Sequence, residues 1–208
     1  MPKRTTKVKD KWRGKTWLKV IAPASFGNTA VTTLPVTEVA NATSRVIETT
    51  LYDLLKDDPN YYNIKLYFKI DRVEGENGYT IFKGHEYSRE FMRSLIRKGS
   101  SMVNFISDYK SRDGYVLRVY VTAFTEGRVN YSKKSAMRAV VDGILKERAA
   151  ALPYDHLVQE IVLNKVASEV FAQAKKVSAL RHLGIRKTKL ISSPKVREQE
   201  VEELATPA

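Results

Sequence analysis

The chain has 208 residues, 43% of them hydrophobic, and a formal net charge of +13 at pH 7. This length suits one sizeable domain, or at most two small ones, with a real core. The net charge is larger than solubility requires and indicates a polyanionic partner. No cysteine occurs, which excludes disulfides and thiolate metal sites and fits a reducing compartment.

The first third of the chain favours strands. Residues 16–21 and 28–34 are rich in β-branched residues and each stops shortly before a proline, so both are expected to be extended. Residues 45–52 are ambiguous, but four β-branched residues among eight favour a strand over a helix. From residue 62 onward, Ile64, Leu66 and Phe68 alternate with Lys65 and Tyr67, which predicts a half-buried strand.

A turn at Gly75-Glu76-Asn77-Gly78 is followed by a return strand at residues 79–82, and the two together predict a hairpin. The same four residues match the Gly-x-x-Gly phosphate clamp of KH domains. That loop needs unhindered backbone amides between helices, whereas Glu76 lies between two predicted strands. We therefore favour the turn.

Ser88 is a candidate N-cap for a short helix that ends at Gly99. Its apolar face is formed by Phe91, Met92, Leu95 and Ile96, and its other positions carry the cations Arg89, Arg93, Arg97 and Lys98. A second hairpin is predicted from residues 102–110 and 115–124. The Asp113-Gly114 pair between them is the strongest short-range hairpin signal.

Two helices are predicted in the last third. Residues 132–150 have apolar side chains at helical spacing and stop before Pro153. Asp155 is expected to cap a longer helix with an apolar stripe of Val158, Val162, Val166 and Val170. After Lys176, the residues Leu183, Ile185, Leu190 and Ile191 indicate a late extended segment inside a basic run.

These elements predict an α+β fold: a small antiparallel β-barrel or curled sheet of about seven strands, flanked by about three helices, with extended basic N- and C-terminal arms. The predicted division is a basic RNA-binding arm at residues 1–15, a globular β-barrel and helix domain at residues 16–191, and a tail at residues 192–208. This tail changes from basic to acidic and is expected to be flexible.

The charge is concentrated at the ends of the chain. Residues 1–19 carry a net charge of +7 and residues 175–197 carry +8, whereas residues 20–174 carry only +2 and the last eleven residues carry −4. Basic segments on a near-neutral body favour nucleic-acid binding, since Lys and Arg displace counterions condensed on phosphates. The alternative is a solvated tail. A membrane surface is disfavoured because the basic ends show no long apolar face.

Three groups of residues are the candidate RNA-binding site. In the N-terminal arm, Trp12 between two cations suits stacking on a base, whereas Trp17 in a predicted strand is expected to be core. A third basic group, around residue 133, opens a helix, where cations oppose the helix dipole and so favour a bound anion. The candidates are Lys3, Arg4, Lys7, Lys9, Lys11, Trp12, Arg13, Lys15, Arg128, Lys133, Lys134, Arg138, Lys175, Lys176, Arg181, Arg186, Lys187 and Lys189.

The sequence offers no support for an enzyme. His85, His156 and His182 are far apart and lack metal-ligand spacing. Neither a Gly-x-x-x-x-Gly-Lys-Ser/Thr loop nor a Gly-x-Gly-x-x-Gly motif opening a helix occurs, and no Gly-x-Ser-x-Gly elbow is present. We expect no catalytic residue, no metal, no cofactor and no small-molecule substrate. The N-terminus lacks the apolar stretch of a secretory signal, so a cytoplasmic location without membrane contact is expected.

Three blocks appear in a specific order. They are Gly14-Lys15-Thr16-Trp17 with Val20-Ile21-Ala22-Pro23 and Phe26, then Arg45-Val46-x-Glu48-x-x-Leu51-x-Asp53-Leu54, then Asp113-Gly114-Tyr115-x-Leu117-Arg118. Together they resemble the ribosomal protein family eS1, also called S3Ae, over about residues 12 to 191. One departure is Ser44, where Gly or His is expected before Arg45.

The resemblance implies an archaeal-type structural constituent of the small ribosomal subunit, with a β-barrel core, on the subunit platform near the mRNA exit. The implied partners are small-subunit ribosomal RNA, neighbouring small-subunit ribosomal proteins and mRNA near its exit. Two other hypotheses remain open. One is a free translation factor that visits the ribosome, and the other is a small-ligand barrel enzyme, which would need a pocket lined by converging titratable groups.

Overall fold

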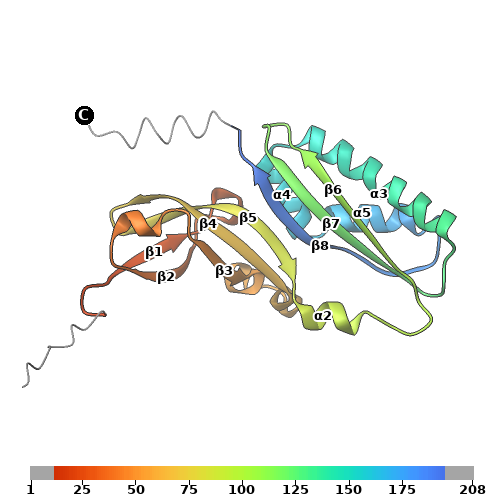
Figure 1. Ribbon diagram of the computed structural model, residues 1–208, viewed down its shortest axis with the longest axis horizontal. Coiled ribbons are helices and arrows are strands. Elements are labelled where there is room, and N and C mark those ends of the chain that lie inside the picture. Colours follow the sequence, from red (N-terminus) through yellow and green to blue (C-terminus); the bar gives the residue numbers. More distant parts are fainter. Residues whose placement is uncertain (1–11, 195–208) are drawn as a thin grey trace, which may run out of the picture.

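The computed structural model describes residues 12–194 of the chain. Within this range it contains eight strands and five α-helices (Figure 1). The strands are β1 Thr16–Ile21, β2 Ala30–Val36, β3 Val46–Thr50, β4 Ile64–Glu74, β5 Asn77–Tyr87, β6 Met102–Lys110, β7 Val116–Thr125 and β8 Leu180–Ser192. The helices are α1 Leu51–Leu55, α2 Arg89–Ser94, α3 Tyr131–Ala151, α4 Tyr154–Val162 and α5 Lys165–Ala174, with short 3-10 helices η1 Ala24–Phe26, η2 Val39–Ala42 and η3 Pro59–Asn63.

Strand β5 joins the two halves of the fold. It pairs along its whole length with β4, antiparallel. Its opposite edge pairs with β1, parallel, at residues 77–79, and with β8, antiparallel, at residues 84–86. A single sheet therefore links a half formed by β1 to β5 with a half formed by β6, β7 and β8, which α3, α4 and α5 cover (Figure 1).

The buried apolar residues form two clusters, and the larger one spans both halves. The smaller cluster contains Leu18, Val20, Val36, Ile47 and Ile70 and fills the inside of the β1 to β4 region. The larger cluster runs from β4 and β5 across β7 to the helices α3, α4 and α5. Alternate residues of β4 from position 64 to 70 are buried, which confirms the strand predicted from their period of two.

The α+β class is confirmed. Of the two predicted arrangements, a barrel or a curled sheet, the barrel is wrong because the sheet does not close. Within the described residues, β2, β3 and β6 each have one strand partner, so the sheet keeps free edges. A barrel requires every strand to have two neighbours. Strand β2 also contains Pro35, which lacks a backbone N–H and is suited to an edge.

Both predicted hairpins are confirmed. The turn at Gly75 connects β4 to β5, and Gly75 has a φ of 58°. Strands β6 and β7 pair in continuous register from Met102 opposite Phe124 to Lys110 opposite Val116. Ser88 caps α2 as predicted, since its hydroxyl accepts a hydrogen bond from the Phe91 N–H.

Three predicted elements have different boundaries in the structure. The helix predicted to end at Gly99 is α2, which ends at Ser94. The segment predicted as a strand to residue 52 becomes α1 after Thr50, because Thr50 and Asp53 form a capping box. The single helix predicted after residue 155 is two helices, separated at Asn164, which has a left-handed φ of 59°. Asp155 is not the cap: Pro153 holds that position, and the Asp155 carboxylate accepts a hydrogen bond from Ser25 Oγ instead (3.3 Å).

The late extended segment is confirmed as β8, but it is not part of an arm. Strand β8 lies between β5 and β7 in the middle of the sheet. The basic run predicted as a C-terminal arm is therefore a structural strand as far as Ser192. The N-terminal arm up to Lys11 and the tail from residue 195 lie outside the described residues.

Candidate nucleic-acid interface

The first described residues present aromatic and cationic side chains side by side. Trp12 is 61% exposed, and the Lys15 ammonium lies 3.6 Å from the centre of its ring. Trp17 is 60% exposed, so the prediction that it belongs to the core is wrong. Because Leu18 and Val20 point into the core, the period-two geometry of β1 turns Trp17 to the opposite, solvent-facing side.

The basic run from residue 175 is divided between two places. Lys175 and Lys176 follow α5 at one end of the sheet, whereas Lys187 and Lys189 lie on β8 near its other end. At about 3.3 Å per residue, the nine steps along the strand from Leu180 to Lys189 separate these places by about 30 Å. The single C-terminal RNA-binding segment predicted from sequence is thus two separate surfaces.

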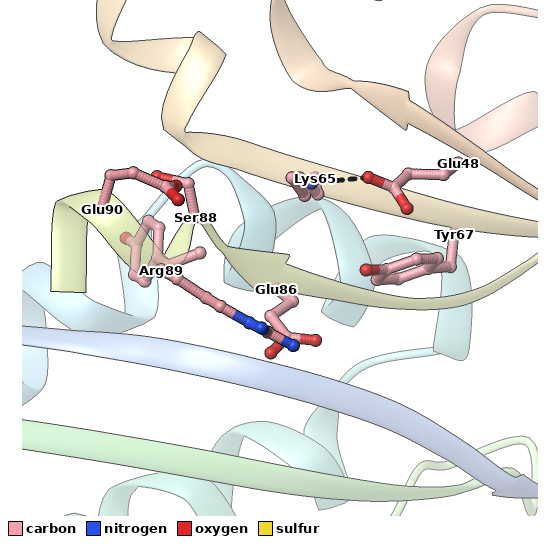
Figure 2. Close-up of a pocket in the computed structure, with 8 residues that line it drawn as sticks. Glu48, Lys65, Tyr67, Glu86, Ser88, Arg89 and Glu90 are labelled. Carbon is pink, nitrogen blue, oxygen red and sulfur yellow. Dashed lines mark hydrogen bonds and ion pairs between the residues drawn. The ribbon is translucent and has the colours of Figure 1, made fainter. Parts of the chain in front are cut away.

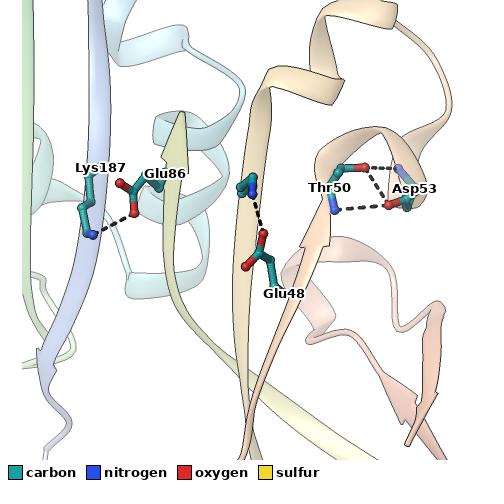
Figure 3. Close-up of polar contacts among 6 residues, drawn as sticks. Glu48, Thr50, Asp53, Glu86 and Lys187 are labelled. Carbon is teal, nitrogen blue, oxygen red and sulfur yellow. Dashed lines mark hydrogen bonds and ion pairs between the residues drawn. The ribbon is translucent and has the colours of Figure 1, made fainter. Parts of the chain in front are cut away.

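Cations on β8 lie in a ladder of charged side chains across the strands. Lys187 Nζ is 2.8 Å from Glu86 on β5, and a second pair on the same face joins Lys65 Nζ to Glu48 at 2.7 Å (Figure 3). Lys189 lies opposite Arg118 of β7 and forms no salt bridge within residues 12–194. Arg186 is also exposed on β8.

Arg118 on β7 forms a salt bridge with Asp108 on β6. Its guanidinium donates two hydrogen bonds to the Asp108 carboxylate, at 2.6 and 2.8 Å. These hydrogen bonds lower the pKa of the Asp108 carboxyl. Charges on this face of the sheet are therefore largely compensated, and Lys189 is better placed than Lys187 to meet a phosphate.

A shallow hollow of about 330 Å³ lies beside this ladder, lined by Glu48, Lys65, Tyr67, Glu86, Tyr87, Ser88, Arg89 and Glu90 (Figure 2). Carboxylates outnumber cations in its lining. Glu48 and Glu86 are each paired with a lysine, and the Arg89 side chain extends toward Glu86 (Figure 2). An open hollow lined by mutually compensated surface charges lacks the converging, unpaired groups that catalysis needs.

Within residues 12–194, a group of cations without salt bridges lies where three connections meet, at the right-hand end of Figure 1. They are the α2–β6 loop, the β7–α3 loop and the α5–β8 turn. The Val129 N–H donates to Ser101 Oγ (3.2 Å), and the Glu126 N–H donates to the Ala179 carbonyl (3.2 Å). We call this surface the basic end; its cations, none of which forms a salt bridge within the described part of the chain, are Arg97, Lys98, Arg128, Lys133, Lys134, Lys175 and Lys176.

Two predicted site residues bind within the protein. The Arg181 guanidinium donates to the Leu95 carbonyl and so ties β8 to the end of α2. Arg138 Nε donates to the Asn104 carbonyl on β6 (3.2 Å). Sequence reasoning did not include Arg97 and Lys98 in the site. The sequence feature that could have identified them is the group of four cations within residues 89–98.

The described residues contain no group of three or more His, Cys, Asp or Glu side chains that could hold a metal ion. Among the helices of residues 12–194, none is long and apolar enough to cross a membrane.

An α+β fold whose unpaired cations gather at one end of its surface has the features of a structural protein of a ribonucleoprotein. Comparison with known protein families identifies the family to which the chain belongs. Residues 3–194 match the Ribosomal S3Ae family, and the chain belongs to this family. It is a family of ribosomal proteins that are structural components of the cytoplasmic ribosome and not enzymes, so the predicted family, non-enzymatic class and location are confirmed.

Three similar archaeal proteins carry the same name. The small ribosomal subunit protein eS1 of Sulfurisphaera tokodaii is 42% identical over 91% of this chain and 97% of its own length. The protein of the same name from Desulfurococcus amylolyticus is 43% identical over 90% of this chain and 87% of its own length. The protein of this name from Sulfolobus acidocaldarius is 40% identical over 93% of this chain and 98% of its own length. The similarity thus spans nearly the whole chain.

Proposed function

We propose that the chain is a structural constituent of the small ribosomal subunit that binds small-subunit ribosomal RNA on the platform, near the mRNA exit. The relatives' shared name supports the subunit. The platform and the proximity of mRNA rest on the family resemblance. The observation that carries RNA binding is the basic end, where exposed cations from three connections lack acidic partners in residues 12–194.

A cluster of unpaired cations of this kind favours RNA binding, because its cations release the counterions condensed on the RNA phosphates. The basic end and Lys189 then contact different parts of the RNA, because they lie on different parts of the fold. The N-terminal arm of residues 1–15 adds further phosphate contacts. Neighbouring small-subunit proteins complete the partners. The acidic stretch from Glu198, with its four glutamates, suits contact with a basic neighbour.

A sucrose gradient tests this proposal. Tagged protein in native cell extract is expected to sediment with the small subunit at about one copy per ribosomal RNA, and to remain there at roughly half-molar salt, since many contacts hold a constituent in place. A translation factor would instead be substoichiometric and leave at that salt concentration. Protein that stays at the top of the gradient would contradict the proposal.

The N-terminal arm gives a sharper prediction. Reversing the charge of Lys7, Lys9, Lys11 and Arg13 to Glu is expected to reduce incorporation into the subunit, and to lower the salt slope of binding by roughly one unit for each phosphate that is no longer neutralised. The matched control exchanges Lys for Arg and Arg for Lys at the same positions, which keeps the charge and is expected to keep incorporation. Normal incorporation of the reversed variant would exclude the arm as an RNA-binding element.

A further inference from the structure

The basic end also carries an aromatic side chain that the fold leaves uncovered. Tyr131 is 77% exposed at the first position of α3. Two other strongly exposed aromatics have a partner, since the Trp12 ring is covered by Lys15 and Tyr62 stacks on Tyr52 with ring centres 4.1 Å apart. Trp17 is also 60% exposed, but it lies on β1 in the other half of the fold. No ring or cation contact to Tyr131 occurs within residues 12–194.

The position of Tyr131 sets its ring among cations. Arg128 precedes it by three residues, and Lys134 follows it on the same side of α3, one turn away. The Lys134 N–H bonds to the Asn130 carbonyl (3.2 Å), so the first turn of α3 is formed and holds the Tyr131 backbone in place. Ile96 is 61% exposed in the α2–β6 loop of the same end. An aromatic ring fixed by a helix between phosphate-binding cations is a platform on which a base can stack.

We infer that the basic end binds a single-stranded segment of RNA, with its cations on the phosphates and Tyr131 stacked on an unpaired base. This inference rests on the proposed RNA-binding function and names the feature recognised. A duplex offers phosphates but keeps its bases stacked inside, so it can use the cations and not the tyrosine. The arrangement therefore predicts a preference for single strands that depends on one side chain.

The test uses the full chain with a short single-stranded RNA carrying 2-aminopurine and a duplex of the same length. Tyr131→Ala is expected to raise the Kd for the single strand about tenfold and to remove the quenching of 2-aminopurine, while the Kd for the duplex stays unchanged. Tyr131→Phe keeps the ring and is expected to keep both properties. Tyr62→Ala removes an exposed tyrosine elsewhere and serves as the matched control, with thermal melts confirming that each variant is folded.

The salt dependence of RNA binding distinguishes a failure of base stacking by Tyr131 from a failure of the proposed RNA binding itself. Tyr131→Ala is expected to leave the slope of log Kd against log salt unchanged, because every cation that neutralises a phosphate is retained. Lys133→Glu with Lys134→Glu is expected to lower that slope by about 0.7 for each single-strand phosphate that these lysines neutralise. If this double variant lowers the slope but Tyr131→Ala changes neither Kd nor quenching, stacking is wrong and phosphate binding stands. If the double variant leaves the slope unchanged, or the wild-type chain binds neither RNA, RNA binding at the basic end is itself wrong.

Discussion

Replacing Gly84 with alanine is expected to destabilise the protein by about 3–5 kcal/mol, a large share of the stability of an ordinary domain. Gly84 lies where β5 pairs with β8, opposite Lys189. A Cβ atom at this position would lie 2.2 Å from the Thr188 carbonyl oxygen, and that oxygen belongs to backbone that cannot turn aside. The two strands would have to separate, and with them the two halves of the sheet. Urea unfolding of the purified variant measures the loss.

Two other glycines provide graded controls for this prediction. A Cβ atom at Gly184 would meet side-chain atoms of Tyr87 and His182 at 3.1 and 3.2 Å, and these side chains can shift, so Gly184→Ala is expected to cost less. Gly143 in α3 has no neighbour within 4 Å, so Gly143→Ala is expected to stabilise the helix by roughly 0.5–1 kcal/mol. A Gly84→Ala variant as stable as wild type would show that β5 and β8 do not approach this closely.

Elements with local signals could be predicted from the sequence. The turn at Asp113-Gly114 and the alternation in β4 lie within a few residues, and both elements have the predicted type. The capping box of Thr50 and Asp53 was also a local signal, but the β-branched residues before it favoured a strand as far as residue 52. Local propensity fixes the type of an element better than its ends.

The arrangement of the sheet could not be predicted in the same way. Strand β8 meets β5 through contacts such as Lys187 with Glu86, which are 101 residues apart. Considered alone, a basic run late in the chain resembles a nucleic-acid-binding arm. The sequence does not show which strand edges of the sheet are free to pair with it. The free edges of β2, β3 and β6, and hence the open sheet, also depend on these distant pairings.

The candidate site shows the same division between local and distant information. Arg128, Lys133 and Lys134 are close in sequence and were predicted together. Their grouping with Arg97 and Lys175 depends on the connections that meet at the end of β6, β7 and β8. The exposure of Tyr131 depends on the same arrangement, because an aromatic residue at a helix start can equally face the core.

His85 is buried in the seam between β5 and β8, with 2% of its surface exposed. Its Nδ1 lies 2.8 Å from Thr188 Oγ1, and its Nε2 lies 3.0 Å from the Ile185 carbonyl oxygen. A carbonyl can only accept, so Nε2 carries the proton and Nδ1 accepts from the threonine hydroxyl. Burial lowers the pKa of His85 from 6.5 to about 4, and the neutral imidazole is therefore the form that the seam holds.

Acid is expected to weaken this seam before it affects the carboxylates. Between pH 6.5 and about 4 the unfolded chain binds a proton at His85 that the folded chain does not, so stability is full above pH 6.5 and falls by about 3 kcal/mol as the pH drops through this window. His85→Gln is expected to be less stable at pH 7 and to lose this part of the pH dependence, which urea unfolding at a series of pH values would measure. His156→Gln, at an exposed position on α4, is the matched control and is expected to keep the wild-type profile. His182, whose pKa burial also lowers, contributes equally to all three proteins, so equal slopes in wild type and His85→Gln would show that His85 is not buried as a neutral group.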